Sequence, residues 1–207
     1  MTSGGFHVEG ETHARSLGAL AFLAYAPMTA IGGGVMYWRA PSTQEFVARL
    51  FGSSILLDMV LGLATGALVV GCFQLAKSRS RELKRLERTF VSLLGSLNRQ
   101  SIMLLAATSA VGEEVLFRGA LQPVLGLGWT ALLFGLLHFP FRRELWCWPV
   151  FAGLAGLLLG WLYDREGSLL APIAAHFAIN AISLELISRR AGRVRGVRVA
   201  SNGSTRS

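Results

Sequence analysis

Long apolar runs alternate with short polar segments along most of the chain. The runs lie at Leu17–Trp38, at Ser54–Ala76, and at about 102–125, 129–139, 148–163 and 168–187. Most are close to the length of about 20 residues with which a helix crosses a bilayer, and only the run at 129–139 is clearly short. The pattern predicts an all-α, polytopic membrane bundle of about six transmembrane helices.

The segment Lys77–Gln100 follows a different pattern. Leu83, Leu86 and Phe90 recur at helical spacing, with arginines and lysines on the opposite face, which is typical of an amphipathic helix lying on the membrane surface. Polar segments flank the bundle, and the basic one from Ser188 is predicted to be disordered. We therefore expect a polar tail at 1–16, two helices and an amphipathic linker at 17–100, a core at 101–187 and a basic tail at 188–207.

Composition and charge agree with a membrane protein. Hydrophobic residues make up 52% of the 207 residues and charged residues only 15%, against about 25% in soluble domains. Of the twenty lysines and arginines, sixteen lie on one side of the six predicted spans and three on the other. This asymmetry predicts that both termini are cytoplasmic. The basic residues occupy loops and tails, so the net charge of +8 predicts contact with membrane lipids and not with nucleic acid.

Ionisable residues interrupt the apolar runs at several positions. Glu113, Glu114 and Arg118 lie near the middle of the third run, where an ionisable side chain costs at least about 2.5 kcal/mol and normally faces the bundle interior. Glu114 and Arg118 are four residues apart and can neutralise each other. Glu113 is left without a local partner, so it is a candidate general base. Asp58, early in the second run, is expected to hydrogen-bond a neighbouring helix.

Two histidines also lie in apolar runs. His138 ends the fourth run, and His176 shares a helical face with Asn180. These groups have the parts for amide hydrolysis, with Glu113 as the base, His138 holding the attacking water, and His176 with Asn180 stabilising an oxyanion. Glu114 and Arg118 would support them. A metal alternative stays open, because Glu113, His138 and His176 would also form a ligand set for zinc or iron.

The polar positions match three motifs in order. "EEVLFR" fits EExxxR, "FGLLH" fits FxxxH and "HFAIN" fits HxxxN. The region from about 102 to 187 therefore resembles the CPBP family of CAAX proteases and bacteriocin-processing proteins, also called ABI, which includes Rce1-type intramembrane endopeptidases. The resemblance implies a glutamic-type protease without a bound metal, a cavity open to the cytoplasmic side, and catalytic roles for Glu113, His138, His176 and Asn180. Glu114 and Arg118 complete the first motif.

The expected function is hydrolysis of a peptide bond in a membrane-associated protein or peptide, such as a CAAX-like, bacteriocin-type or C-terminal sorting-signal substrate. Two alternatives stay open. A non-catalytic scaffold or immunity protein of the same fold would act by binding, and a small proton-coupled transporter would use the Glu and His residues as a proton relay. The expected location is the inner membrane of a bacterium. The sequence does not determine the oligomeric state or the substrate.

Overall fold

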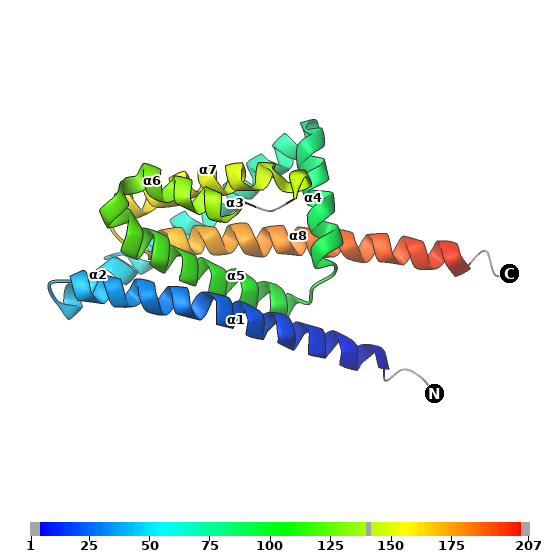
Figure 1. Cartoon of the computed structure of the whole chain (residues 1–207), viewed down its shortest axis with the longest axis horizontal. Helices are drawn as coiled ribbons and strands as arrows, with labels where there is room; N and C mark the ends of the chain where they lie inside the picture. Colours follow the sequence, from blue (N-terminus) through cyan, green and yellow to red (C-terminus); the bar gives the residue numbers. More distant parts are fainter. Residues whose placement is uncertain (1–4, 140–141, 204–207) are drawn as a thin grey trace.

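The computed structural model describes residues 5–139 and 142–203, and within these ranges the chain is helical with no strands (Figure 1). The all-α prediction is confirmed. The elements are α1 (Gly5–Arg39), α2 (Thr43–Phe51), α3 (Ile55–Arg79), α4 (Arg81–Leu94), α5 (Arg99–Glu114), the π-helix η1 (Val115–Leu121), α6 (Gln122–Leu137), the short 3₁₀ turn η2 (Arg143–Leu145), α7 (Cys147–Glu166) and α8 (Leu170–Gly203).

Five helical stretches of the described chain are long and apolar enough to cross a membrane. They are Leu20–Arg39, Thr43–Arg79, Arg99–Leu137, Cys147–Glu166 and Leu170–Val194. The third and fourth predicted spans both fall within Arg99–Leu137, a stretch of 39 residues. This stretch turns at Gly126, whose φ of 78° and ψ of 165° are not helical and favour glycine. Beyond the turn α6 runs back toward the other end of the bundle, packed against α7 and η1 (Figure 1), so the stretch makes two arms, in agreement with the sequence.

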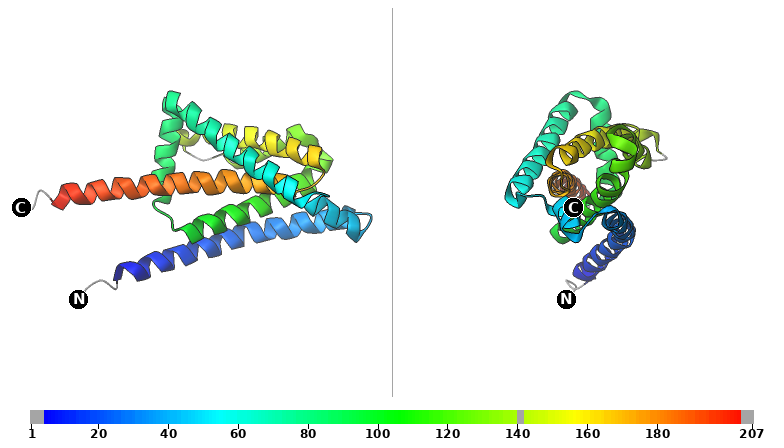
Figure 2. Two further views of the ribbon diagram at one scale, coloured as in Figure 1. Left: turned by 180° about the vertical axis from the view of Figure 1, so that it is seen from behind. Right: turned by 90° about the vertical axis from the view of Figure 1, so that its left-hand side faces the viewer.

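Helix α8 lies at the centre of the bundle. It packs against α3 and α5, α6 packs against α7, and α1 covers α5 and η1 (Figure 2). Many large apolar side chains remain exposed on the outer helices, among them Phe22, Leu56 and Leu68. An apolar exterior of this extent suits contact with lipid and not with water. The predicted location in a membrane is supported in this general sense.

The connections sort to two ends of the bundle. Helix α4, η2, the start of α1 and the end of α8 lie at one end, and α2 lies at the other (Figures 1 and 2). An ion pair of 3.7 Å between Arg85 and Glu144 links α4 to η2. The segments that carry most of the lysines and arginines therefore share one end, as the alternating topology requires. Which end faces the cytoplasm stays a prediction.

The amphipathic helix predicted between Lys77 and Gln100 is present as α4. The side chain of Ser80 caps its first turn, and Gly95, with a φ of 64°, ends it. Leu86 is buried on its inner face. Asp58 accepts a hydrogen bond from the Ser168 hydroxyl at 2.7 Å. The partner lies in the turn between α7 and α8 and not in a neighbouring helix, as was predicted.

Two features differ from the sequence prediction. Helix α2 was not predicted; the Ser42 hydroxyl accepts a hydrogen bond from the Glu45 amide and starts it. Helix α8 continues to Gly203, through most of the segment that was predicted to be disordered. The first turn of this extension is fastened to the bundle, because Ser188 exchanges hydrogen bonds with the backbone of Leu97 and Arg190 pairs with Glu87.

Close packing of α3 on α8 depends on two glycines. A Cβ atom added to Gly62 would lie 2.3 Å from the Ala171 carbonyl oxygen, and one added to Gly66 would lie 2.4 Å from that of Ala175. Small residues at such a contact let two helix backbones approach closely. Glycine is needed at both positions because the α8 backbone itself occupies the space.

Gly62→Ala is expected to lower the thermal unfolding midpoint of the detergent-solubilised protein. The added methyl group forces α3 away from α8, and overpacking of this kind costs about 1–3 kcal/mol. Gly71→Ala, in the same helix, is the control, because a Cβ there meets nothing within 4 Å. The packing argument fails if both variants unfold at the wild-type temperature.

Candidate active site

A fully buried ion pair lies at the junction of α5 and η1. Arg118 donates to Glu114 Oε1 at 2.9 Å, and their side chains are 1% and 0% exposed. Arg118 also donates to the Gly156 carbonyl of α7 at 3.2 Å and lies 4.6 Å from the ring centroid of Phe134 on α6. The predicted pairing is confirmed, and the pair also links this junction to two further helices.

The first motif spans a change of helix type. Glu113 and Glu114 end the α-helix α5, and Arg118 lies in the π-helix η1. A π-helical turn adds a residue to the usual repeat, is rare, and is found frequently at functional sites. Here it lies directly after the two carboxylates, at the place where the chain contacts α1.

The Glu113 carboxylate faces both intramembrane histidines. Its Oε2 atom lies 3.8 Å from His138 Nε2 and 3.9 Å from His176 Nε2. These distances are too long for hydrogen bonds. Among the described residues, Oε2 has no hydrogen-bond partner although it is buried. Such a group is expensive to bury and calls for an explanation in function or bound solvent.

The backbone fixes the orientation of His138. Its Nδ1 atom lies 2.7 Å from the Phe134 carbonyl oxygen. A carbonyl oxygen only accepts, so the proton is on Nδ1 and the neutral ring presents a lone pair at Nε2. That lone pair points to the region in front of Glu113. The ring is further held between Phe134, at 4.5 Å between centroids, and Trp148, at 5.8 Å.

The two predicted oxyanion-stabilising residues are each oriented by a second side chain. His176 donates from Nδ1 to Glu114 Oε1 at 2.6 Å. Glu114 therefore serves Arg118 and His176 together, a link that the sequence did not reveal. Asn180 donates from Nδ2 to Ser109 Oγ at 2.9 Å, and Ser109 in turn donates to the Leu105 carbonyl. One N–H of the Asn180 amide is used in this way, and its second remains for another acceptor.

A cavity of about 200 Å³ joins these groups. All four predicted catalytic residues line it, namely Glu113, His138, His176 and Asn180. Glu114 and Arg118 lie behind it, in the supporting position that the sequence predicted. The catalytic roles themselves stay predictions.

Several cavity residues were missed by the sequence prediction. Tyr25 of α1 lines the cavity and is close enough to Glu113 for phenol and carboxylate to interact. Trp148 and Phe151 form an aromatic wall from α7. Tyr25 carries no local signal, because it lies in an apolar helix almost ninety residues before Glu113. Gly112 lets α1 lie close enough to α5 to bring Tyr25 to the cavity. A Cβ atom at this position would lie 2.9 Å from the backbone oxygen of Tyr25.

The metal alternative depends on how closely three donors converge. Within residues 5–139 and 142–203, no group of three His, Cys, Asp or Glu side chains is arranged to hold a metal ion. His176 is turned so that its Nδ1 is occupied by Glu114, and only its Nε2 faces Glu113. Whether the reaction uses a metal stays a matter for experiment.

Helices long and apolar enough to cross a membrane therefore surround a cluster of Glu113, His138, His176 and Asn180. Residues 96–182 match the family described as Rce1-like type II CAAX prenyl endopeptidases. This match confirms the predicted family resemblance for that part of the chain, and all four predicted catalytic residues lie within it.

One curated relative is similar to this chain over a stretch of comparable length. The Bacillus subtilis (strain 168) protein described as "Uncharacterized protein YpbD" is 38% identical over 81 residues, which is 39% of this chain and 42% of that protein. The similarity therefore spans about two fifths of the relative's length. No solved structure gives a significant match.

Arg118→Met is expected to destabilise the protein by about 3–5 kcal/mol, because it leaves the Glu114 carboxylate buried with its main counter-charge removed. The matched control is Arg49→Met, which breaks another Glu–Arg pair with the same spacing at the surface and is expected to cost less than about 1 kcal/mol. Thermal unfolding in detergent compares the two. Equal effects would show that the buried pair is not a structural centre.

Proposed function

We propose that this chain is an intramembrane endopeptidase that hydrolyses a peptide bond of a membrane-associated protein or peptide. The match of residues 96–182 to the Rce1-like family supports endopeptidase activity in general. One observation carries the proposal for this chain: the unpartnered Oε2 of Glu113 faces two imidazole nitrogens across a cavity that Asn180 also lines.

In the proposed mechanism Glu113 is the general base. Separations of 3.8 and 3.9 Å suit a water molecule bridging Glu113 and a histidine. A neutral His138 accepts at Nε2, so a water donating to both His138 and Glu113 turns an oxygen lone pair toward the substrate carbonyl. Glu113 takes the proton as the water attacks, and it returns the proton to the amine that leaves.

The proposed oxyanion site consists of His176 and Asn180. The free N–H of the Asn180 amide is one donor. The Nδ1–H group of His176 already donates a hydrogen bond to Glu114. The ring can therefore act as the second donor only through a protonated Nε2. The Glu114 carboxylate holds the His176 ring in place, and Arg118 holds the carboxylate. This division explains why the motif needs two adjacent glutamates, one facing the cavity and one behind the histidine.

We propose that no metal takes part and that both termini are cytoplasmic in a bacterial inner membrane. The metal-free mechanism is supported by the placement of the side chains, since among the described residues no three His, Cys, Asp or Glu side chains are arranged to hold a metal ion together. The orientation is supported by the basic segments gathered at one end of the bundle.

Glu113→Gln is expected to abolish cleavage while the protein stays abundant, since the substitution keeps the size of the side chain and removes the base. General bases contribute about 10²–10⁴-fold to rate. The measurement is a mass-spectrometric comparison of protein termini in host cells carrying wild type or variant. Glu82→Gln, an exposed glutamate on α4, is the control and should leave all termini unchanged.

A defined set of termini that disappears only with Glu113→Gln identifies the substrates. Unchanged termini at equal abundance would refute the protease and leave a scaffold. Uptake or efflux of a solute that depends on Glu113 would instead indicate a transporter. Activity of the purified protein that survives a zinc chelator supports the metal-free mechanism, and its loss with recovery on adding zinc contradicts it.

The proposed orientation predicts the behaviour of reporter fusions. Green fluorescent protein at the C-terminus should fluoresce, because it folds in the cytoplasm. Alkaline phosphatase fused after Glu166, at the opposite end of α7, should also be active. This enzyme folds to its active form only outside the cytoplasm, where the orientation places Glu166. The reverse pair of results would invert the assigned orientation.

A further inference from the structure

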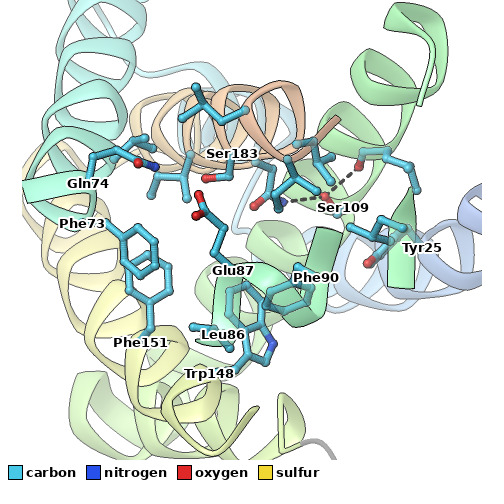
Figure 3. A pocket seen from close by; sticks show the side chains of 18 residues that line it. Tyr25, Phe73, Gln74, Leu86, Glu87, Phe90, Ser109, Trp148, Phe151 and Ser183 are labelled. Atoms are coloured by element: carbon cyan, nitrogen blue, oxygen red, sulfur yellow. Dashed lines mark hydrogen bonds between the residues drawn. The ribbon is translucent and has the colours of Figure 1, made fainter. Parts of the chain in front are cut away.

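Tyr25 is a polar residue of the catalytic cavity for which the proposed mechanism has no role. It lies in the apolar stretch Leu20–Arg39 of α1, is half-buried, and has its phenol close enough to the Glu113 carboxylate for the two to interact. Figure 3 looks into a pocket adjoining the cavity and shows Tyr25 on the same side as Ser109 of α5. The family match begins at residue 96, so it includes neither Tyr25 nor any other part of α1.

Three glycines let α1 lie directly on the helix that carries the first motif. A Cβ atom on Gly112 would lie 2.9 Å from both the Cβ atom and the backbone oxygen of Tyr25. A Cβ atom on Gly32 would lie 2.8 Å from the backbone of η1, and one on Gly119 would collide with the Met36 side chain. Gly112 immediately precedes the two glutamates of the motif, and Gly119 immediately follows its arginine. The two helices therefore approach closely on both sides of the motif, which fixes where Tyr25 stands.

A hydrogen bond at the other end of α1 strengthens this contact. The Arg39 guanidinium donates to the Ala120 carbonyl oxygen at 2.7 Å. Ala120 lies in the π-helix η1, one residue before its end. Helix α1 is thus tied to the motif helix from Gly112 to Ala120. The backbone at Tyr25 is held at a fixed distance from Glu113, and only two side-chain torsions remain to place the phenol.

The two adjacent glutamates differ in how they are held. Arg118 and His176 both donate to Glu114, at 2.9 and 2.6 Å. Glu113 faces the histidines across 3.8 and 3.9 Å, and its Oε2 has no hydrogen-bond partner in the part of the chain that the structure describes. A carboxylate can rotate at the end of its side chain. A base that must aim one oxygen at a water therefore needs a donor on the other oxygen.

The Tyr25 phenol has the right chemistry for this task. An ionised carboxylate only accepts hydrogen bonds, so the phenol is the donor between the two groups. A phenol carries one proton, so it occupies one carboxylate oxygen and leaves the other free. A hydrogen bond to a charged acceptor is short and about twice as strong as one between neutral groups, which suits it to fix the orientation of a side chain.

We propose that Tyr25 is a positioning residue for Glu113: its phenol donates to one carboxylate oxygen and so keeps the other, Oε2, turned toward His138 and His176. Tyr25 acts through Glu113 and need not touch the substrate. This inference rests on the proposed function and adds to the catalytic unit a helix, α1, that the family match leaves out.

The first test detects the contact without a substrate. Infrared spectra of the full chain in detergent micelles are recorded for wild type and Glu113→Gln, and their difference contains the carboxyl band of Glu113. The same difference is measured in Tyr25→Phe and Tyr37→Phe backgrounds. Tyr37 is the matched control, because it also lies on α1 but is 59% exposed and packs on Phe46. The band should shift with Tyr25→Phe and stay in place with Tyr37→Phe. An unshifted band in both backgrounds would overturn the inference.

The second test measures what the contact does. The probe is a synthetic peptide that spans one of the protein termini lost with Glu113→Gln. Tyr25→Phe should lower kcat about tenfold, equivalent to about 1.4 kcal/mol, and leave KM within about twofold of wild type, because the hydroxyl acts on the base and not on binding. Tyr37→Phe should leave kcat, KM and the thermal unfolding midpoint unchanged. An unchanged kcat, a loss shared by Tyr37→Phe, or a fall in kcat that accompanies a lowered unfolding midpoint would leave Tyr25 without a positioning role.

The two proposals fail in different ways. If the infrared band does not move, while wild type cuts the peptide and Glu113→Gln does not, the Tyr25 inference is wrong and the protease stands. If no protein terminus depends on Glu113, the protease is refuted, and the positioning role is refuted with it even where the band shifts.

Discussion

The Glu114 carboxylate is the group on which the bundle around the site depends. It accepts hydrogen bonds from Arg118 and His176, and Arg118 reaches on to the backbone of α7 and the Phe134 ring of α6. A buried charge of this kind is tolerated only when its partners are fixed. One ion pair therefore sets the relative positions of α5, η1, α6, α7 and α8. The Oε2 atom of Glu113 can face the cavity without a hydrogen-bond partner because the neighbouring Glu114 holds the surrounding helices.

Much of the fold could be predicted from the sequence, because a membrane imposes a simple rule on length and polarity. The apolar runs gave the spans, and the rarity of charge within them pointed to Glu113, Glu114 and Arg118. Local signals gave the Glu114–Arg118 pair and the shared face of His176 and Asn180. Helix α2 was also within reach, since Ser42 and Glu45 have the spacing of a helix start.

Other features depend on tertiary contacts and leave little trace in the sequence. The link of Glu114 to His176 joins residues 62 positions apart, and Tyr25 enters the cavity from a helix outside the matched region. The turn at Gly126 arises from the backbone conformation of one residue within an apolar run. The cavity is therefore assembled from a core recognisable by its motifs and from flanking helices that are not. Chains that share the motifs can differ in substrate through these flanking helices.

The turn at Gly126 also bears on how the protein is made. Arg99–Leu137 is one apolar stretch, and no charged residue separates its two arms between Arg118 and Leu137. A polar loop that could be held in water between the arms is missing from this stretch. The insertion machinery therefore receives both arms as one apolar stretch. The second carboxylate and its arginine are four residues apart in the first arm, so they can pair as soon as that arm is helical. The arm with the proposed base and the arm with the first histidine then enter the membrane together, and α7 later fills the space beside α6.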